Sequence, residues 1–285
     1  MSYEAPETLD AAVGLLAGES GQVKVLAGGT DVLVQIHADM IEPDVIVDIK
    51  KIAEMREVTN EDGAWRFGAA VTGKELMDHP GFNAAWPGIM DGVRLLGSVQ
   101  VRGRATVGGN VCNASPAADS VPPMITAKAV ATVVGPNGTR EVPVEDIGIA
   151  PGKTSLEAGE FVVSFQLPKR PARSGDAYLR FTPRTEMDIA VVGCAVNLAL
   201  DDAGICTDAI VSLGAVAARA LIVDAAAKAL IGTTVDDAAM EVLAAAASAA
   251  ATPIDDKRGT VEFRTEVAGV LAQRAAAIAL ERAKS

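Results

Sequence analysis

Cysteine and histidine are scarce in this sequence of 285 residues, which limits the metal chemistry that the chain can support. The three cysteines, Cys112, Cys194 and Cys206, form no Cys-x-x-Cys pair and no other spacing typical of a metal site. The two histidines, His37 and His79, are too far apart to form a site together, and both are expected in surface or turn positions. We therefore predict that this chain holds no iron–sulfur cluster, no zinc and no other metal.

Long apolar runs are absent as well. No run approaches the roughly 18–20 residues that a membrane-spanning helix needs. The opening residues MSYEAPETLD lack the basic region and apolar core of a secretory signal, and an odd number of cysteines without such a signal is typical of the reducing cytoplasm. The formal net charge of −12 argues against nucleic acid as a partner, because phosphate binding requires a basic surface. We expect a cytoplasmic protein that neither spans a membrane nor binds nucleic acid.

Several common catalytic and nucleotide-binding patterns are missing too. The two Gly-Gly pairs, at 28–29 and 108–109, do not fit the motif Gly-x-Gly-x-x-Gly. Neither pair is accompanied by the lysine of a P-loop. We identify no Ser–His–Asp arrangement and no convincing pair of acid–base carboxylates. These absences argue against a Walker-type nucleotide site and a doubly wound dinucleotide fold, and they predict that the chain has no catalytic residue of its own.

The order of the predicted elements indicates an α+β fold. Near the N-terminus, a helix is expected over 6–18. It is followed by a strand over 23–27, a helix that starts with DVLVQI at 31–36 and a strand over 44–49, which together form a compact βαβ-like unit. A hairpin, a helix over 73–77, another helix around 84–96 and three further strands follow. Within this stretch, Thr72 and Glu75 make a capping box that predicts the start of a helix.

A change in the pattern of the sequence marks a second part of the chain. Three strand-like segments precede three alanine-rich helical segments that begin near residues 220, 236 and 260. This order indicates helices on one face of an antiparallel sheet. We expect a first domain over 1–172, with subdomains of about 1–55 and 56–172, and a second domain with three strands and three helices over 173–285.

Two glycine pairs stand in similar contexts, in LAGGTD at 26–31 and in ATVGGN at 105–110. A single Gly-Gly is usually a tight turn that needs a positive φ. Here, each pair is expected to follow an apolar strand and to lead into polar residues. The first would present backbone N–H groups at a helix start, and the second would present them in a concave nest. Two such rows suit a ligand with two adjacent phosphates.

On these and other segments, the chain resembles the FAD-binding medium subunit of molybdenum hydroxylases, the family of carbon monoxide dehydrogenase and the xanthine dehydrogenases. The resemblance extends over nearly the whole chain, in LAGGTDVLVQI, DVIVDI, QVRGRATVGGNVCNASPAADSVP, FTPRTEMDIAVVGCAV, LGAVAARA and PIDDKRGTVEFR. It implies an FAD-binding domain of the vanillyl-alcohol-oxidase-like (PCMH) type, followed by a C-terminal domain with an antiparallel sheet and helices.

The resemblance also implies which residues bind the cofactor. The first glycine turn and the second would contact the FAD phosphates, and five further residues would surround the rest of the molecule. The implied cofactor-binding residues are Val25, Leu26, Ala27, Gly28, Gly29, Thr30, Asp31, Val32, Leu96, Thr106, Val107, Gly108, Gly109, Asn110, Asp119, Val162, Arg180 and Ile189.

Three of these positions are polar and have alternative interpretations. A carboxylate beside phosphate is repelled, so Asp31 is expected to cap the following helix or to bind N–H groups of the turn. Asp119 is placed by the resemblance beside the hydroxyl-bearing chain of the flavin, and it could instead cap a turn or helix. Arg180 matches a lysine found near the cofactor in some members, or it is a solvated charge at the end of a strand.

The apolar positions are also open to two interpretations. Leu96 and Val162 match residues that flank the flavin or its adenine, although either could simply belong to the core. Ile189 matches a position over the isoalloxazine ring, where some members carry tyrosine. The alternation in IAVVGCAV predicts a strand with Ile189 at its start, so this residue is either a gate over the ring or a core residue between the two domains.

The function implied by the resemblance is electron transfer. Electrons would pass from a molybdopterin site on a large subunit, through two [2Fe-2S] clusters on a small subunit, to FAD on this chain and then to an external acceptor. The implied assembly is a dimer of heterotrimers. Two alternatives are a stand-alone flavin oxidoreductase of the vanillyl-alcohol-oxidase or UDP-N-acetylenolpyruvoylglucosamine-reductase type, and an assembly subunit that has lost FAD.

Overall fold

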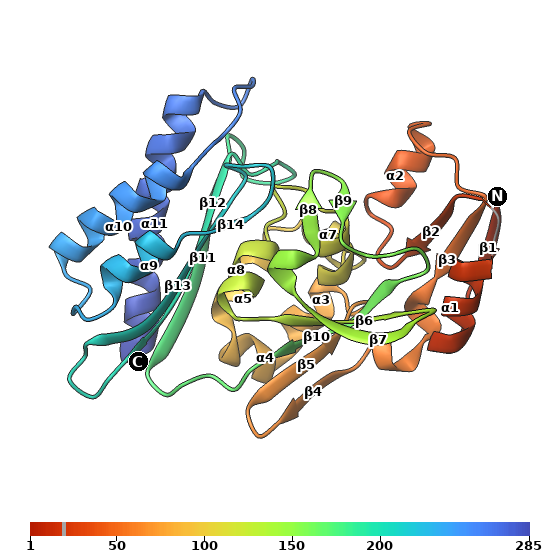
Figure 1. Ribbon diagram of the computed structural model, residues 1–285, viewed down its shortest axis with the longest axis horizontal. Coiled ribbons are helices and arrows are strands. Elements are labelled where there is room, and N and C mark those ends of the chain that lie inside the picture. Colours follow the sequence, from red (N-terminus) through yellow and green to blue (C-terminus); the bar gives the residue numbers. More distant parts are fainter. Residues whose placement is uncertain (19–20) are drawn as a thin grey trace.

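The computed structural model describes residues 1–18 and 21–285, and it shows two regions that lie side by side along the longest axis (Figure 1). The N-terminal region extends from β1 to β10, and the C-terminal region extends from β11 to α11. Each region has its own hydrophobic cluster and its own sheets. The mixture of helices and sheets confirms the predicted α+β fold.

A small parallel sheet forms the N-terminal end, with the strand order β1-β3-β2. Its elements are β1 (Ser2–Glu4), α1 (Leu9–Gly18), β2 (Val23–Leu26), α2 (Val32–His37) and β3 (Val45–Asp48). The central strand β3 begins with the β-branched run Val45–Val47 and is buried at every position, as expected for a strand covered on both faces. The parallel pairing of β2 and β3 confirms the predicted βαβ-like unit, while β1 was not predicted.

An antiparallel sheet with the order β4-β5-β10-β6-β7 supports the rest of the N-terminal region. Its strands are β4 (Val58–Glu61), β5 (Ala64–Gly68), β6 (Val130–Gly135), β7 (Gly138–Pro143) and β10 (Phe161–Leu167). A two-stranded ribbon, β8 (Gly148–Ala150) and β9 (Lys153–Thr154), precedes β10, and one-turn helices cover Ile49–Lys51, Ala53–Met55 and Val144–Asp146.

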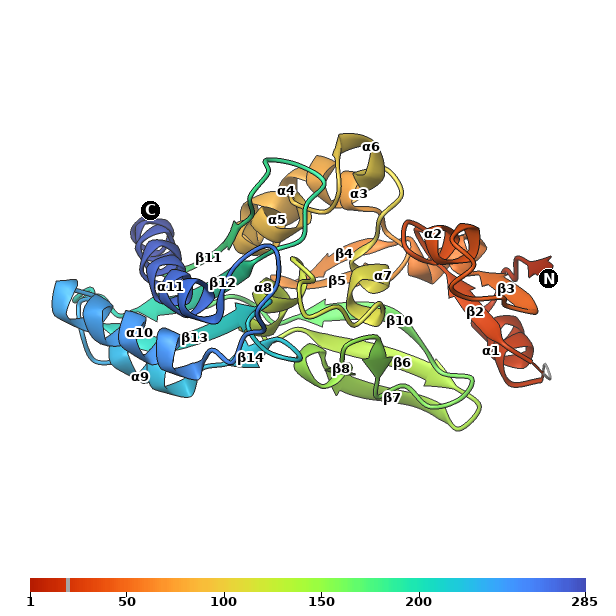
Figure 2. The same cartoon turned by 90° about the horizontal axis from the view of Figure 1, so that it is seen from above.

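Six short helices connect β5 to β6 and gather on one side of this sheet (Figure 2). They are α3 (Gly73–Asp78), α4 (Pro80–Ala85), α5 (Pro87–Val93), α6 (Val99–Arg102), α7 (Val107–Cys112) and α8 (Val121–Thr126). The capping box of Thr72 and Glu75 at α3 is confirmed. The single helix expected over 84–96 is wrong, because Pro87 begins a new helix directly after α4 ends.

The C-terminal region is an antiparallel sheet with three helices on one face (Figures 1 and 2). Its elements are β11 (Ser174–Phe181), β12 (Val192–Leu200), β13 (Cys206–Gly214), β14 (Leu221–Ile222), α9 (Asp224–Leu230), α10 (Asp237–Ala250) and α11 (Val261–Lys284). The short edge strand β14 makes the sheet four-stranded, where three strands were expected.

Small side chains let α11 lie directly on the sheet. A Cβ atom added to Gly175 of β11 would lie 2.0 Å from the carbonyl oxygen of Ala279. Six buried alanines line the same helix at Ala268, Ala272, Ala275, Ala276, Ala279 and Ala283. The alanine-rich composition of this part of the sequence therefore reflects close packing of a helix on a sheet.

Polar contacts join the two regions next to α5. The N–H of Gly88 donates to Asp176 of β11 at 2.9 Å, and Arg282 of α11 forms an ion pair with Asp91 at 2.7 Å. Asp176 is 1 % exposed and also accepts from Arg170 at 2.8 Å, so its buried carboxylate is partnered on both oxygens. These contacts fix the orientation of β11 against the N-terminal region, and β11 carries one of the side chains that line the pocket described next.

Candidate functional site

A pocket with a volume of about 670 Å³ lies where the two regions meet. It is bounded by the β2–α2 turn, α7, the start of β10 and the segment between β11 and β12. Every residue predicted for the site lines this pocket except Leu26 and Val107, whose side chains are buried beside it at 7 % and 1 % exposure. Residues from positions 25 to 189 therefore converge on one cavity, whose size is typical of a small-molecule site.

The first glycine turn needs its two glycines for different reasons. Gly29 has a φ of +79°, a left-handed conformation that side chains other than glycine rarely adopt. A Cβ on Gly28 would lie 2.2 Å from the carbonyl oxygen of Arg104 and 3.0 Å from the Cα of Ala105. The first turn therefore rests directly on the segment that leads into the second, and the two glycine pairs form a single wall.

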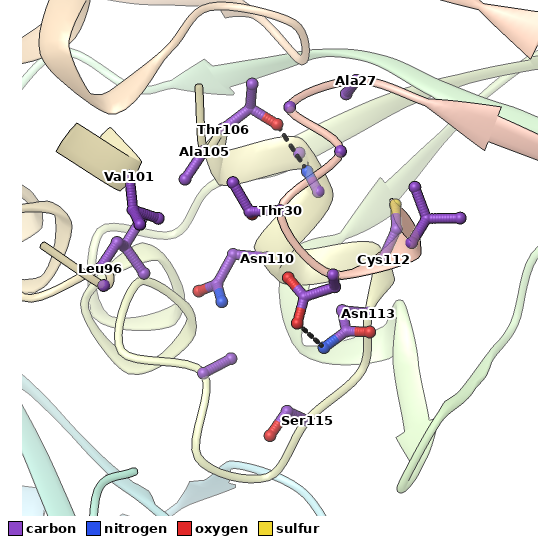
Figure 3. Close-up of a pocket in the computed structure, with 18 of the residues that line it drawn as sticks. Ala27, Thr30, Leu96, Val101, Ala105, Thr106, Asn110, Cys112, Asn113 and Ser115 are labelled. Atoms are coloured by element: carbon purple, nitrogen blue, oxygen red, sulfur yellow. Dashed lines mark hydrogen bonds between the residues drawn. The ribbon is translucent and has the colours of Figure 1, made fainter. Parts of the chain in front are cut away.

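The start of α2 presents free backbone donors to the pocket. Among the described residues, we find no acceptor for the N–H groups of Thr30, Asp31 and Val32, and all three residues line the pocket. Donors left in this way at a helix start attract an anion. Thr30 lies across the cavity from Leu96 and Val101 (Figure 3).

The capping role expected for Asp31 is wrong. The residue occupies the N-cap position of α2, but its backbone is in the αR conformation and its side chain accepts no hydrogen bond from the helix. Its Oδ1 instead accepts from Nδ2 of Asn113 at 3.3 Å (Figure 3). Burial raises the pKa of Asp31, which reduces the cost of a carboxyl group near an anion.

The second glycine pair is not a nest after a strand, as the sequence suggested. It lies in the first turn of α7, where Oγ1 of Thr106 accepts from the N–H of Gly109 at 2.9 Å (Figure 3). A Cβ on Gly108 would lie 2.5 Å from the carbonyl oxygen of Ala69, so this glycine lets α7 pack against the end of β5. A Cβ on Gly109 would approach only Oγ1 of Thr106, at 3.1 Å. Gly109 is thus the glycine that leaves open space beside the pocket.

Asn110 follows directly on α7 and is oriented by the next helix. Its Oδ1 accepts from Oγ of Ser120 at 2.7 Å and from the N–H of Ser120 at 3.3 Å. This pair of contacts holds the amide in one orientation at the pocket wall (Figure 3). The sequence suggested the residue but not the partner that fixes it.

A buried ion pair lies at the inner end of the pocket. Arg180 of β11 donates to Oδ2 of Asp119 at 2.5 Å, and the side chains are 5 % and 7 % exposed. Tyr178 donates to the other carboxylate oxygen at 2.8 Å. Burial raises the pKa of Asp119 to about 6, although the charge of Arg180 and both hydrogen bonds oppose that rise.

These contacts decide two of the open alternatives. Arg180 is not a solvated charge at the end of a strand, because its guanidinium is buried against Asp119. Asp119 caps neither a turn nor α8, since its side chain is bound to Tyr178 and Arg180. Tyr178 was not predicted from the sequence, and no local pattern identifies it, because its partner lies 59 residues earlier in the chain.

The segment between β11 and β12 forms an exposed rim of the pocket. Ile189 is 52 % exposed and Met187 is 56 % exposed, and both line the cavity. The side chain of Asp188 is 5 % exposed and accepts from the N–H of Ile189 at 2.9 Å and of Arg184 at 3.2 Å. The core interpretation of Ile189 is therefore wrong. β12 begins only at Val192, so Ile189 is not the start of a strand.

The remaining walls are apolar. Leu96 and Val162 are 7 % and 3 % exposed and line the pocket, joined by Phe161, which sequence analysis did not select. Cys112 also lines it, and burial raises the pKa of this thiol to about 12, so the sulfur is protonated at neutral pH. The site therefore combines backbone donors, one buried ion pair and apolar surfaces.

Within residues 1–18 and 21–285, no group of three or more histidine, cysteine, aspartate or glutamate side chains could hold a metal ion. No helix in the same ranges is both long enough and apolar enough to cross a membrane.

Two family models match consecutive parts of this chain. The model described as the FAD binding domain in molybdopterin dehydrogenase matches residues 1–170. The model described as the CO dehydrogenase flavoprotein C-terminal domain matches residues 177–279. Together they span both regions of the structure.

Individual relatives agree with these matches. The xanthine dehydrogenase FAD-binding subunit of Escherichia coli O157:H7 is 38 % identical over 203 residues, which cover 70 % of this chain and 69 % of the relative. The carbon monoxide dehydrogenase medium chain of Afipia carboxidovorans is 31 % identical over 283 residues, which cover 99 % and 98 %. A solved carbon monoxide dehydrogenase from Hydrogenophaga pseudoflava superposes with a TM-score of 0.94 at 32 % identity, covering 99 % of this chain and 98 % of that chain.

Proposed function

This chain belongs to the family of FAD-binding domains of molybdopterin dehydrogenases, and we propose that it is the FAD-binding, electron-transfer subunit of a molybdenum-containing hydroxylase or dehydrogenase. One observation supports this most directly. The two glycine turns, 80 residues apart in the sequence, rest on each other at Gly28 and line one pocket of about 670 Å³.

The residues present fit FAD. The unpartnered N–H groups of Thr30, Asp31 and Val32 would bind the pyrophosphate, and Gly109 would leave room for it. Asp119 would accept a hydrogen bond from a hydroxyl group of the cofactor.

The apolar lining fits the rest of the cofactor. Leu96 and Val162 would cover its flat ring surfaces, because both are buried at the pocket wall. Ile189 would shield one ring edge from the solvent at the exposed rim. We propose that the remaining positions of the two turns contribute through their backbone, with Leu26 and Val107 shaping the turns from beneath. Asn110 and Arg180 contribute through their side chains.

FAD supplies the redox chemistry when it is bound, because it can accept and donate both single electrons and electron pairs. The protein residues bind it, orient it and limit the access of water and acceptors. Cys112 is protonated and Asp119 is held in an ion pair, so neither group suits the proton transfer that a stand-alone flavin oxidoreductase requires.

The assembly and the domain boundaries are part of the same proposal. The Afipia relative is the medium chain of a carbon monoxide dehydrogenase, which supports partners of other sizes. We propose a small subunit with two [2Fe-2S] clusters, a large molybdopterin subunit, and a dimer of such heterotrimers. We further propose a boundary at residue 172, between the end of β10 at Leu167 and the start of β11 at Ser174.

An absorption spectrum tests the proposal. The purified full chain is mixed with FAD, and unbound FAD is removed. The protein is then expected to show an absorption band at about 450 nm, with one flavin per chain. It is expected to leave carbon monoxide and xanthine unchanged until the partner subunits are added. A chain that retains no flavin, or that oxidises such a substrate alone, would contradict the proposed function.

A further inference from the structure

Tyr178 lies behind the pocket and reaches it only through another side chain. It belongs to β11, its side chain is 2 % exposed, and its hydroxyl group donates to Oδ1 of Asp119 at 2.8 Å. Arg180, two residues further along the strand, donates to Oδ2 at 2.5 Å. Residues two apart on a strand point to the same face, so one face of β11 holds both oxygens of one carboxylate.

The neighbouring strand leaves room for the tyrosine ring. In the β11–β12 pairing, Arg180 is opposite Gly193 and Tyr178 is opposite Ala195, which makes Gly193 the diagonal neighbour of Tyr178. A Cβ on Gly193 would lie 2.4 Å from the tyrosine hydroxyl and 3.1 Å from Cζ. The missing side chain at Gly193 is therefore what allows the phenol to reach Asp119.

We propose that Tyr178 is a positioning residue for the pocket, which holds the carboxylate of Asp119 ionised and fixed so that it can receive a hydroxyl group of the ligand. Gly193 is the second half of this arrangement. The identity of the ligand as FAD rests on the proposed function. The positioning itself rests on the contacts of β11 and β12 with Asp119.

Opposing effects of its surroundings decide whether the carboxyl group of Asp119 is neutral or ionised. Burial favours the neutral acid, whereas the guanidinium of Arg180 and the hydrogen bond from Tyr178 favour the ionised form. Loss of the tyrosine hydroxyl group would therefore raise the pKa of Asp119 above its value of about 6. The carboxyl group would then be partly neutral at pH values where it is now charged.

Other charged or titratable groups approach this pair from two further elements. Cys194 of β12 lies near Tyr178, and burial raises the pKa of its thiol to about 12, so it carries no charge. Asp91 of α5 accepts from the N–H of Tyr178 at 3.3 Å, and it is itself paired with Arg282. Cys194 is uncharged and Asp91 binds the backbone N–H of Tyr178, so the charged partner of the tyrosine hydroxyl is Asp119.

The test is the pH dependence of FAD binding to the full chain. Affinity is expected to fall as the pH drops through the pKa of Asp119, because the neutral acid accepts hydroxyl groups poorly. With Tyr178→Phe, the midpoint of that fall is expected to move upward by about one pH unit, the shift typical of one lost hydrogen bond to a charged group. An unchanged midpoint would overturn the inference.

Two further variants sharpen this test. Gly193→Ala keeps the tyrosine hydroxyl group but pushes it away from Asp119, so the midpoint of this variant is expected to move in the same direction. Tyr3→Phe is the matched control, because Tyr3 also donates to a carboxylate, Asp48, at 2.5 Å, and neither residue lines the pocket. A shift in the control as large as that in Tyr178→Phe would also overturn the inference.

A measurement without ligand separates this inference from the proposed function. The carboxyl carbon of Asp119 can be titrated by NMR in the ligand-free chain, where its midpoint is expected to rise in Tyr178→Phe and in Gly193→Ala. If the wild-type chain binds no FAD at any pH, the proposed function fails, and this titration still decides the role of Tyr178. Equal midpoints in the wild type and both variants would refute that role.

Discussion

The two glycine turns look alike in the sequence and differ in the structure. The turn before α2 contains Gly29 with a φ of +79°, and no side chain caps the helix that follows. The start of α7 contains no glycine with a positive φ, and Thr106 caps the helix. A shared Gly-Gly pattern therefore does not imply a shared backbone conformation.

The comparison shows that glycine serves three separate purposes here. Gly29 permits a left-handed backbone, while Gly28 and Gly108 allow one backbone to touch another at carbonyl oxygens. Only Gly109 leaves space on the pocket side. Substitutions at these glycines separate the three purposes by their effects on folding and on ligand binding.

The largest effect is expected where a Cβ atom would strike backbone. Gly28→Ala and Gly108→Ala place that atom 2.2 Å and 2.5 Å from carbonyl oxygens that cannot move alone. We expect each to lower the free energy of unfolding by about 3 kcal/mol, as overpacking does. Urea denaturation measures this loss. Gly14→Ala in α1 is the control, because no atom lies within 4 Å of its added Cβ; losses no greater than in this control would refute the close approach.

A different result is expected at Gly109. Gly109→Val adds a side chain next to Thr106 and beside the pocket, where the proposed pyrophosphate would lie. We expect the Kd for FAD to rise at least about tenfold, which corresponds to roughly 1.4 kcal/mol, with a smaller loss of stability than in Gly108→Ala. Fluorescence titration with FAD measures the affinity. Unchanged affinity in a folded Gly109→Val chain would remove this turn from the site.

The sequence predicts the two glycine turns better than it predicts the residues that surround them. The glycine pairs, the capping box at Thr72 and the alternating strands are local patterns, so they were found. The contact of Gly28 with Arg104 joins residues 76 positions apart, and that of Tyr178 with Asp119 joins residues 59 apart. Contacts of this kind depend on tertiary packing, and no local pattern carries them.

The rim segment shows a second limit of local patterns. Alternation in IAVVGCAV placed Ile189 on a strand, but the carboxylate of Asp188 accepts from two backbone N–H groups, and β12 begins only at Val192. A side chain that binds its own backbone competes with strand pairing. The alternation of apolar residues predicted the strand β12 correctly, but it predicted the first residue of that strand wrongly.

An intermediate effect is expected from the helix caps. Thr106→Ala removes the hydrogen bond to the N–H of Gly109, which should cost about 1 kcal/mol of stability. Asp31→Ala removes no capping bond, so a change of about 0.5 kcal/mol or less is expected. Parallel urea denaturation of both variants measures the difference. Equal losses would contradict the distinction between the two helix starts.

The smallest effect on folding is expected at the rim. Ile189→Ala shortens a side chain that is 52 % exposed, so stability should change by about 0.5 kcal/mol or less. The rate at which oxygen or a quinone reoxidises the reduced holoprotein is expected to rise, because the ring edge loses its cover. Stopped-flow absorbance measures that rate. A loss near the 2–5 kcal/mol typical of a core isoleucine, with an unchanged rate, would favour a packing role.

The central claim is that the two glycine turns together bind a pyrophosphate. Comparing the affinities of the full chain for FAD and for riboflavin tests it most directly, because riboflavin has the same ring and no phosphate. The account predicts that FAD binds at least about tenfold more tightly, a difference of roughly 1.4 kcal/mol, and that Gly109→Val reduces this preference. Equal affinities for FAD and riboflavin would contradict the claim.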